Sequence, residues 1–107
     1  MHITSDKVAE VIILARELDR GEAEFDGFVG RLNEEEQVAL VAIFWIGRGS
    51  FEPEEYAEAY KTAISEASAP TEDYLKGSPH LADHLESGLE ALGIDSSDAE
   101  DDLYRGG

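Results

Sequence analysis

The fold of this chain is decided by nine consecutive apolar residues, Val38-Ala39-Leu40-Val41-Ala42-Ile43-Phe44-Trp45-Ile46. Asn33 and three glutamates, Glu34 to Glu36, come shortly before them. The spacing of Asn33 and Glu36 fits a capping box, in which each side chain accepts a hydrogen bond from a free amide of the first helical turn. The acidic run also suits the positive end of a helix dipole, so the stretch predicts a helix although its residues would accept a strand.

The end of this helix is predicted at Gly47-Arg48-Gly49, because glycine permits a left-handed cap and arginine suits the negative end of the dipole. Residues 34–48 make about four turns at 3.6 residues per turn. A helix that is apolar on every side needs other elements around it, and the run is far shorter than the roughly 20 residues that span a bilayer. We therefore predict a buried central helix.

The rest of the chain predicts further helices. Thr4 or Ser5 caps a first helix that Gly21 stops, Pro53 opens a third, and Ser78-Pro79 opens the last. The main helices are expected at about 5–19, 34–48, 53–68 and 79–92, with short helical turns at about 25–31 and 71–76. The predicted fold is all-α, a compact single-domain bundle of four main helices around the central one.

Apolar stripes predict which side chains face the core. The third helix presents Tyr56, Tyr60, Ala63, Ile64 and Ala67, and the last presents Leu81, Leu85, Leu89 and Leu92. Residues 22–30 are acidic and contain two glycines, so we expect a loop there whose aromatic side chains fold onto the core. Thr71 is expected to cap the helical turn at 71–76. Residues 1–94 form the predicted helical domain, and the acidic segment 95–107 is predicted to be a disordered tail.

The charge of the chain limits its partners. Its 107 residues carry 25 acidic and 8 basic side chains, a net charge of −17. This charge repels the phosphates of nucleic acids and anionic membrane surfaces, so neither is an expected partner. The chain has no cysteine, and its first residues lack the basic and apolar blocks of a signal peptide, so a cytoplasmic location is expected.

Several blocks of the sequence resemble a known family. They are Ile3-Thr4-Ser5, Leu32-Asn33-Glu34-Glu35-Glu36-Gln37, Leu40 to Gly49, Leu75-Lys76-Gly77-Ser78-Pro79 and Leu81 to Leu89. In this order they are similar to a family of small uncharacterised bacterial, mainly proteobacterial, all-helical proteins catalogued only as a domain of unknown function. The resemblance covers most of residues 3–93 and implies no activity or ligand. In that family the positions of His80 and His84 are usually apolar or aromatic.

His80 and His84 are candidate metal ligands. They are four residues apart and therefore lie on one side of the predicted last helix, where two imidazoles can share a zinc or nickel ion. A third ligand would have to come from His2 or a distant carboxylate. The favoured alternative is a pair of partly buried histidines beside the leucine stripe, since no recognised metal motif is present.

Arg48, Gly49 and Phe51 form a second candidate, an anion or partner site at the end of the central helix. Arg48 is the one cation near the apolar centre, and the flanking glycines would let a ligand approach the backbone. The favoured alternative is an arginine that stabilises the helix end and pairs with Glu52 or Glu55, because one arginine beside glycines is no phosphate loop.

The sequence contains no catalytic motif and predicts no cofactor, which inclines the interpretation away from an enzyme. The leading hypothesis is a non-catalytic protein–protein interaction module whose acidic surface, or a groove beside residues 47–51, binds a basic partner. One alternative is a metal-binding protein or small enzyme centred on His80 and His84. Another is a structural subunit of a homodimer. The sequence leaves the oligomeric state open.

Overall fold

A computed structural model describes residues 2–93 of the protein, and the regular elements of this part of the chain are all helices, without a strand. The elements are α1 (Ser5–Arg16), α2 (Leu18–Arg31), α3 (Glu34–Arg48), the 3₁₀ turn η1 (Pro53–Glu55), α4 (Tyr56–Glu66), α5 (Thr71–Lys76) and α6 (Leu81–Ala91). The predicted all-α fold is confirmed. The predicted acidic tail, 95–107, lies outside the described residues.

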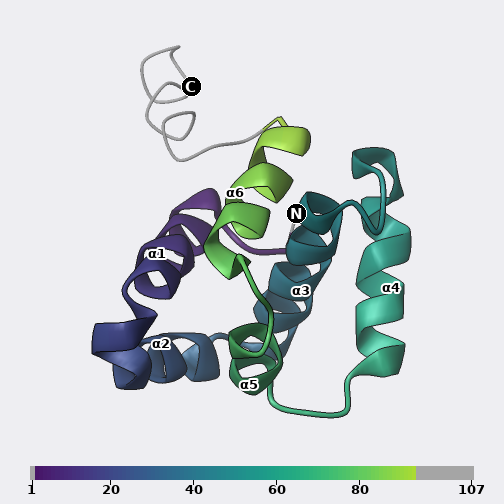
Figure 1. Ribbon diagram of the computed structural model, residues 1–107. Helices are drawn as coiled ribbons and strands as arrows, with labels where there is room; N and C mark the ends of the chain where they lie inside the picture. Colours follow the sequence, from purple (N-terminus) through teal and green to yellow (C-terminus); the bar gives the residue numbers. More distant parts are fainter. Residues whose placement is uncertain (1, 94–107) are drawn as a thin grey trace, which may run out of the picture.

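Helix α3 is the centre of the fold, as predicted. It packs against α6, α4 and α5, while α1 closes over α6 and α2 joins α1 to α5 (Figure 1). Five of its side chains are fully buried: Ala39, Leu40, Ala42, Ile43 and Phe44. Burial of this much apolar surface is the main term that holds the bundle together. No helix of residues 2–93 has the length and apolar character needed to cross a membrane.

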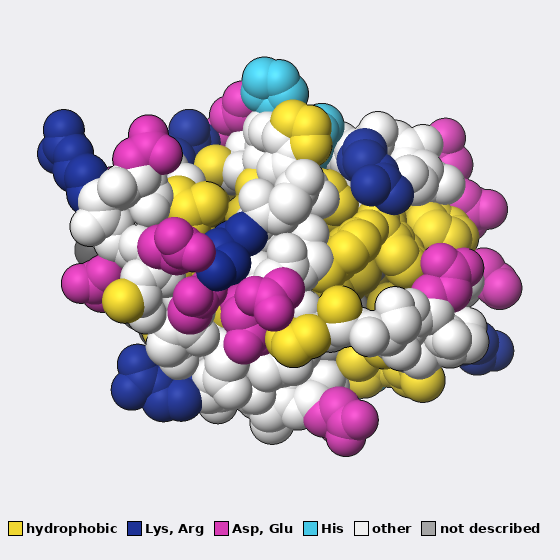
Figure 2. Space-filling model, turned by 60° about the horizontal axis from the view of Figure 1, so that its bottom comes forward, with side chains coloured by type: hydrophobic (Ala, Val, Ile, Leu, Met, Phe, Trp, Pro, Cys, Tyr) yellow, Lys and Arg dark blue, Asp and Glu magenta, His cyan; other side chains and the backbone are white. Residues whose placement is uncertain are grey.

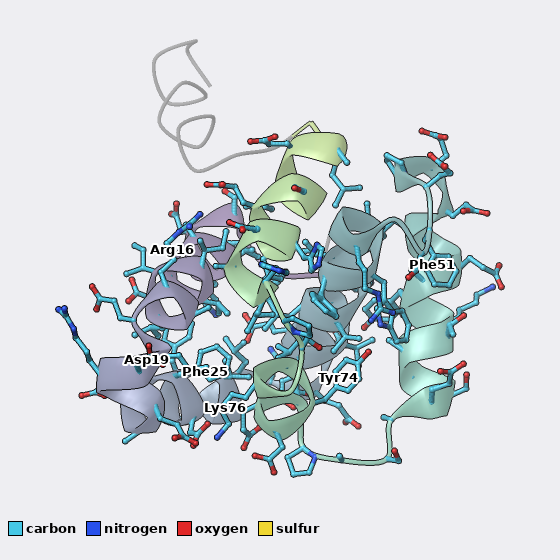
Figure 3. All side chains as sticks on the ribbon, viewed as in Figure 1. Arg16, Asp19, Phe25, Phe51, Tyr74 and Lys76 are labelled. Carbon is cyan, nitrogen blue, oxygen red and sulfur yellow. The ribbon has the colours of Figure 1, made fainter. Side chains whose placement is uncertain are left out.

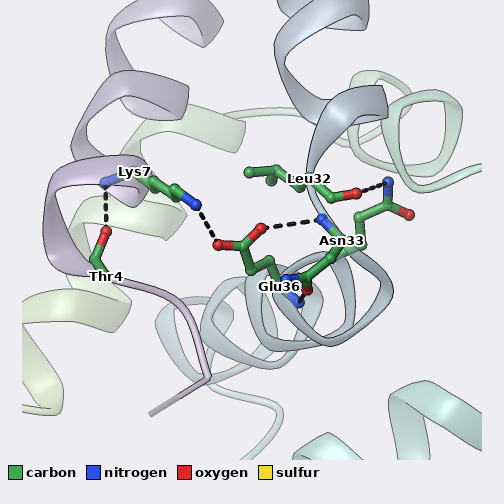
Figure 4. A network of polar contacts seen from close by, with 6 residues as sticks. Thr4, Lys7, Leu32, Asn33 and Glu36 are labelled. Carbon is green, nitrogen blue, oxygen red and sulfur yellow. Dashed lines mark hydrogen bonds and ion pairs between the residues drawn. The ribbon is translucent and has the colours of Figure 1, made fainter.

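The predicted capping box is present at the start of α3 (Figure 4). Asn33 Oδ1 accepts from the backbone amide of Glu36 at 2.8 Å, and Glu36 Oε1 accepts from the amide of Asn33 at 3.0 Å. Glu36 Oε2 also accepts a hydrogen bond from Lys7 Nζ. Thr4 caps α1 by accepting from the amide of Lys7 at 3.2 Å. The carboxylate of Glu36 thus links the first turn of α1 to the first turn of α3.

Glu36 is expected to contribute stability that depends on pH. The hydrogen bond from Lys7, followed by that from the backbone of Asn33, lowers the pKa of Glu36. A carboxyl whose pKa is lower in the folded state stabilises the fold above its unfolded pKa, and this contribution is lost as pH falls through the folded pKa. Glu36→Gln should therefore flatten the fall of melting temperature between about pH 5 and pH 3.

The control for this measurement is Glu10→Gln, which removes the same charge from an exposed position on α1. Both variants reduce the net repulsion equally, so any difference in slope reports the hydrogen bonds of Glu36. Identical melting curves for the two variants across this pH range would contradict the assignment.

Two glycines bring α3 and α6 into backbone contact. A Cβ atom on Gly47 would lie 1.6 Å from the carbonyl oxygen of His84, and one on Gly88 would lie 2.2 Å from that of Ile43. Gly47 therefore belongs to the helix crossing. The helix ends at Arg48 and Gly49 forms the left-handed cap with φ 90°, so the end predicted at Gly47-Arg48-Gly49 is confirmed. Glycine at both positions lets the helices approach more closely than any side chain would allow.

For residues 22–30 the predicted loop is wrong, whereas the short helical turn predicted at about 25–31 is part of a longer helix. Helix α2 runs from Leu18 to Arg31, broken only at Gly21, whose φ of −143° and ψ of 48° are not helical. The first helix correspondingly ends at Arg16, before the predicted 19. Phe25 and Val29 are fully buried on one side of α2. Their i, i+4 spacing outweighs the cost of helical glycine, about 1 kcal/mol each.

Two predicted helix starts require correction. Thr71 is the first residue of α5 and Pro70 precedes it, so Thr71 is not the cap. The last helix begins at Leu81, and His80 before it adopts a left-handed conformation with φ 58°.

The short α5 is held to α2 by Lys76, whose Nζ lies 2.8 Å from Asp26 and 2.7 Å from Glu22. Hydrogen bonds to these carboxylates raise the pKa of Lys76 above its usual range.

Candidate functional site

A groove opens where α4 stands apart from the rest of the bundle. Helix α4 packs mainly on α3, and the linker 67–70 carries the chain across to α5 (Figure 1). The inner part of this groove is a hollow of about 140 Å³. Its walls come from α3, the end of α4, the linker and α5, and its main apolar members are Val38, Val41, Trp45, Ala63, Ala67 and Tyr74. We call the whole feature the α4 groove.

The outer part of the α4 groove is wider and more acidic. It has a volume of about 440 Å³, and Glu34, Glu35, Tyr60, Ile64 and Pro70 contribute to its walls. It shares Val38, Ala67, Ala69 and Thr71 with the inner hollow, so the two are continuous. Figure 2 shows hydrophobic side chains gathered over a hollowed face of the molecule, with acidic and basic side chains at its edge.

The floor of the groove is one face of the central helix. Val38, Val41 and Trp45 follow one another at helical spacing and are the apolar residues of α3 that line the inner hollow. The prediction that other elements would surround this helix on every side therefore holds only in part. Val38 and Val41 are partly exposed, whereas the opposite face of α3 is fully covered.

Aromatic contacts fix the wall beside α5. Trp45 Nε1 donates to the hydroxyl of Tyr74 at 2.8 Å, and the ring of Phe51 stacks on Trp45 with centroids 5.8 Å apart. Tyr74 also meets the edge of Phe44 at 6.3 Å. Figure 3 shows Tyr74 extending from α5 toward α4. Because Trp45 is hydrogen-bonded and stacked, this wall is preformed.

Exposed hydrophobic side chains concentrate at the groove. Three large ones are exposed in residues 2–93: Ile64 at 55%, Ile13 at 51% and Tyr74 at 38%. Two of these, Ile64 and Tyr74, line the groove. The prediction that Ile64 faces the core is wrong, because the buried residues of α4 are two of its three alanines, Ala59 and Ala63. Clustered exposed apolar groups are typical of interaction sites, unlike scattered single ones.

The electrostatic field at the groove is negative. Glu34 and Glu35 lie at its outer part and Glu66 at its inner part. Burial raises the pKa of Tyr60, and the charges of Glu35 and Glu34 raise it further. A negative potential at a partly apolar surface favours cationic groups over anionic ones.

The two candidate metal ligands lie away from the groove. The rings of His80 and His84 are perpendicular with centroids 6.4 Å apart, and His84 meets the edge of Phe44 at 5.6 Å. The possible third ligand, His2, stacks on Tyr60 at 4.0 Å. Residues 2–93 contain no group of three or more His, Cys, Asp or Glu side chains that could hold a metal ion. Metal binding by His80 and His84 stays a prediction.

The candidate anion or partner site is occupied by local contacts. Arg48 lies over the ring of Phe44, 5.1 Å from its centroid, and its Nε donates to Ser50 Oγ at 3.1 Å. Within residues 2–93, Arg48 forms no ion pair with Glu52 or Glu55, so that predicted pairing is wrong. Glu55 instead accepts from the amide of Glu52 at 2.8 Å. Arg48, Gly49 and Phe51 line neither part of the α4 groove, and their role as a binding site stays a prediction.

Sequence reasoning missed the α4 groove. One signal was available: Val38, Val41 and Trp45 form an apolar face of α3, and the linker 67–70 that crosses it has only small residues and a proline to cover it. The groove depends on how far α4 stands from α5, which no local pattern encodes.

Comparison with known proteins gives a family. The chain matches no curated protein and no solved structure. Residues 22–94, which include every residue of the α4 groove, match the model of one family, and the chain therefore belongs to the family described as "Protein of unknown function (DUF3775)".

Proposed function

We propose that this protein is a non-catalytic protein–protein interaction module that binds a basic partner through its acidic surface, with the α4 groove as the contact. The observation that carries the proposal is the groove itself: a preformed apolar floor with exposed Ile64 and Tyr74, flanked by glutamates. Protein interfaces typically combine such a buried apolar centre with a polar rim.

The charge of the chain supports the choice of partner. With a net charge of −17, the protein attracts cationic surfaces and speeds their association at low salt. The inner hollow, about 140 Å³, has the size of one inserted side chain, and the outer part, about 440 Å³, is wider and lies between acidic residues.

The proposal is tested by capture and reconstitution. The immobilised protein is exposed to an extract of its source cells, and each captured protein is purified and its Kd measured at two ionic strengths. We expect a basic protein whose affinity falls at least about tenfold between roughly 50 and 300 mM salt, because screening weakens attraction between charged surfaces. Failure of every captured protein to bind after purification, or affinities indifferent to salt, would refute the proposal.

A matched pair of variants locates the contact. Glu34→Gln/Glu35→Gln/Glu66→Gln removes three charges at the groove. Glu10→Gln/Glu24→Gln/Glu90→Gln removes three exposed charges from α1, α2 and α6. The groove variant should weaken the reconstituted complex clearly more than its control, since close charge pairs contribute most to specific binding. Equal losses would place the contact elsewhere on the acidic surface.

A further inference from the structure

We infer that the α4 groove accepts one face of a cationic amphipathic helix from the partner, with an aromatic or aliphatic side chain inserted between α3, α4 and α5. The inference rests on the proposed function and specifies the part of the partner that is recognised. It follows from the shape of the groove, the size of its inner hollow and the distribution of charge around it.

The shape of the groove favours a helix. Residues 2–93 offer no strand edge to which an extended peptide could add, whereas helices commonly bind in a hydrophobic groove through residues spaced at i, i+3 or i+4, and i+7. The floor runs from Val38 to Trp45, which is about 10 Å along α3 at 1.5 Å per residue. Two turns of a partner helix have the same length, so two or three apolar side chains would cover the floor.

The inner hollow fits one anchoring side chain. Its volume is about 140 Å³, and an apolar cavity of about 150 Å³ holds a benzene molecule. Its apolar walls are the side chains of Val38, Val41, Trp45 and Tyr74 together with alanines of α4 and the linker, and Glu66, Ser68 and Thr71 are its polar members. A phenylalanine or leucine of the partner would fill the apolar part of this space.

The charges around the groove favour a partner helix that also carries basic residues. Glu34 and Glu35 lie at the outer part of the groove and Glu66 at the inner part, so lysine or arginine next to the apolar side chains of the partner would lie near a carboxylate. A second copy of this chain is a poor occupant, since each copy carries a net charge of −17.

The inference is tested with a phage-displayed library of random peptides of about 16 residues, selected on the folded full-length protein. We expect enriched sequences to carry an aromatic residue or leucine with a second apolar residue three or four positions away, and lysine or arginine beside them. Synthetic peptides from the selection should gain helical circular dichroism on binding. Enrichment of basic peptides without the apolar spacing, or of peptides that bind without becoming helical, would overturn the inference.

Variants then show whether these peptides occupy the groove. Ile64→Ser removes an exposed apolar group at the groove, and Ile13→Ser is its matched control, with exposed fractions of 55% and 51%. Ala67→Arg places a large cation in the wall shared by both hollows. Ile64→Ser should weaken peptide binding at least about fivefold and Ala67→Arg should abolish it, while Ile13→Ser leaves it unchanged. Circular dichroism establishes that each variant is folded.

Failure of this inference differs from failure of the proposed function. If the natural partner binds in a salt-dependent way but is indifferent to Ile64→Ser and Ala67→Arg, binding of a basic partner through the acidic surface stands, while the groove contact and the helix inference both fall. If sedimentation shows a dimer of the wild type that Ile64→Ser dissociates, the occupant is a second copy and the inference is overturned. If no partner binds, the proposed function itself fails.

Discussion

Replacing Gly47 by alanine should destabilise the fold by about 3 kcal/mol or more, although it adds a single methyl group. The new Cβ would lie 1.6 Å from the carbonyl oxygen of His84, and the amide nitrogen of Gly88 is only 2.8 Å from the same position. Both contacts are with backbone, so no side-chain rotation can relieve them. Helices α3 and α6 would have to separate, and every contact along their interface would loosen.

The measurement is urea-induced unfolding of the wild type and of Gly47→Ala, monitored by circular dichroism. A loss of this size corresponds to a fall in melting temperature of roughly 15 °C for a domain of this length. Gly30→Ala is the matched control. Its Cβ would lie 3.5 Å from Glu72, an ordinary contact, and alanine is favoured over glycine in a helix by about 1 kcal/mol. The control should therefore be as stable as wild type or more so, and similar losses in both variants would contradict the close crossing.

Phe44→Ala should cost about 3–5 kcal/mol, the usual range for a fully buried phenylalanine. Phe44 lies where α3, α5 and α6 meet, with ring edges against Tyr74 and His84 and the guanidinium of Arg48 over its face. Truncation leaves a cavity lined by groups on three helices, which cannot collapse without shifting all of them. The free energy of unfolding of the variant, measured in urea, gives the loss directly.

The control for this prediction is Phe28→Ala on α2, because Phe28 is only partly buried against the core. Phe28→Ala removes the same atoms but less buried surface, so it should lower the free energy of unfolding clearly less than Phe44→Ala does. Equal losses for Phe28→Ala and Phe44→Ala would mean that Phe44 is not the junction of the three helices.

The parts of the fold that were predictable are those where local and long-range signals agree. The start of α3 is an example: Asn33 and Glu36 form a local capping box, and the apolar run after them requires burial. Both lead to the same helix, and both of its predicted bounds are correct. The inner leucines of α6, Leu81, Leu85 and Leu89, are buried as their spacing predicted.

The errors arise where a residue's local preference differs from its role in packing. The glycines of α2 indicate a loop locally, but burial of Phe25 and Val29 stabilises a helix. Gly47 has the local character of a helix end, but it also admits another backbone, and Gly88 gives the matching signal about forty residues later. Which two glycines meet is a property of the assembled bundle.

The candidate site was the least predictable part. The sequence draws attention to reactive residue types, so His80, His84 and Arg48 became candidates. Most of the groove is built from residue types such as valine, alanine, tyrosine and glutamate, which are common in any helical protein. The groove exists because α4 and the linker 67–70 leave one face of α3 uncovered, and the amino-acid composition alone does not predict that.

The hydrogen bond between Trp45 and Tyr74 has a practical consequence. Trp45 is the single tryptophan of the chain, and it forms part of the groove wall. Indole emission responds to polarity and to hydrogen bonding at its N–H, so the tryptophan fluorescence of the unmodified protein originates at this one wall. Any molecule that enters the inner hollow replaces water beside this fluorophore, and the protein therefore carries its own optical probe of occupancy.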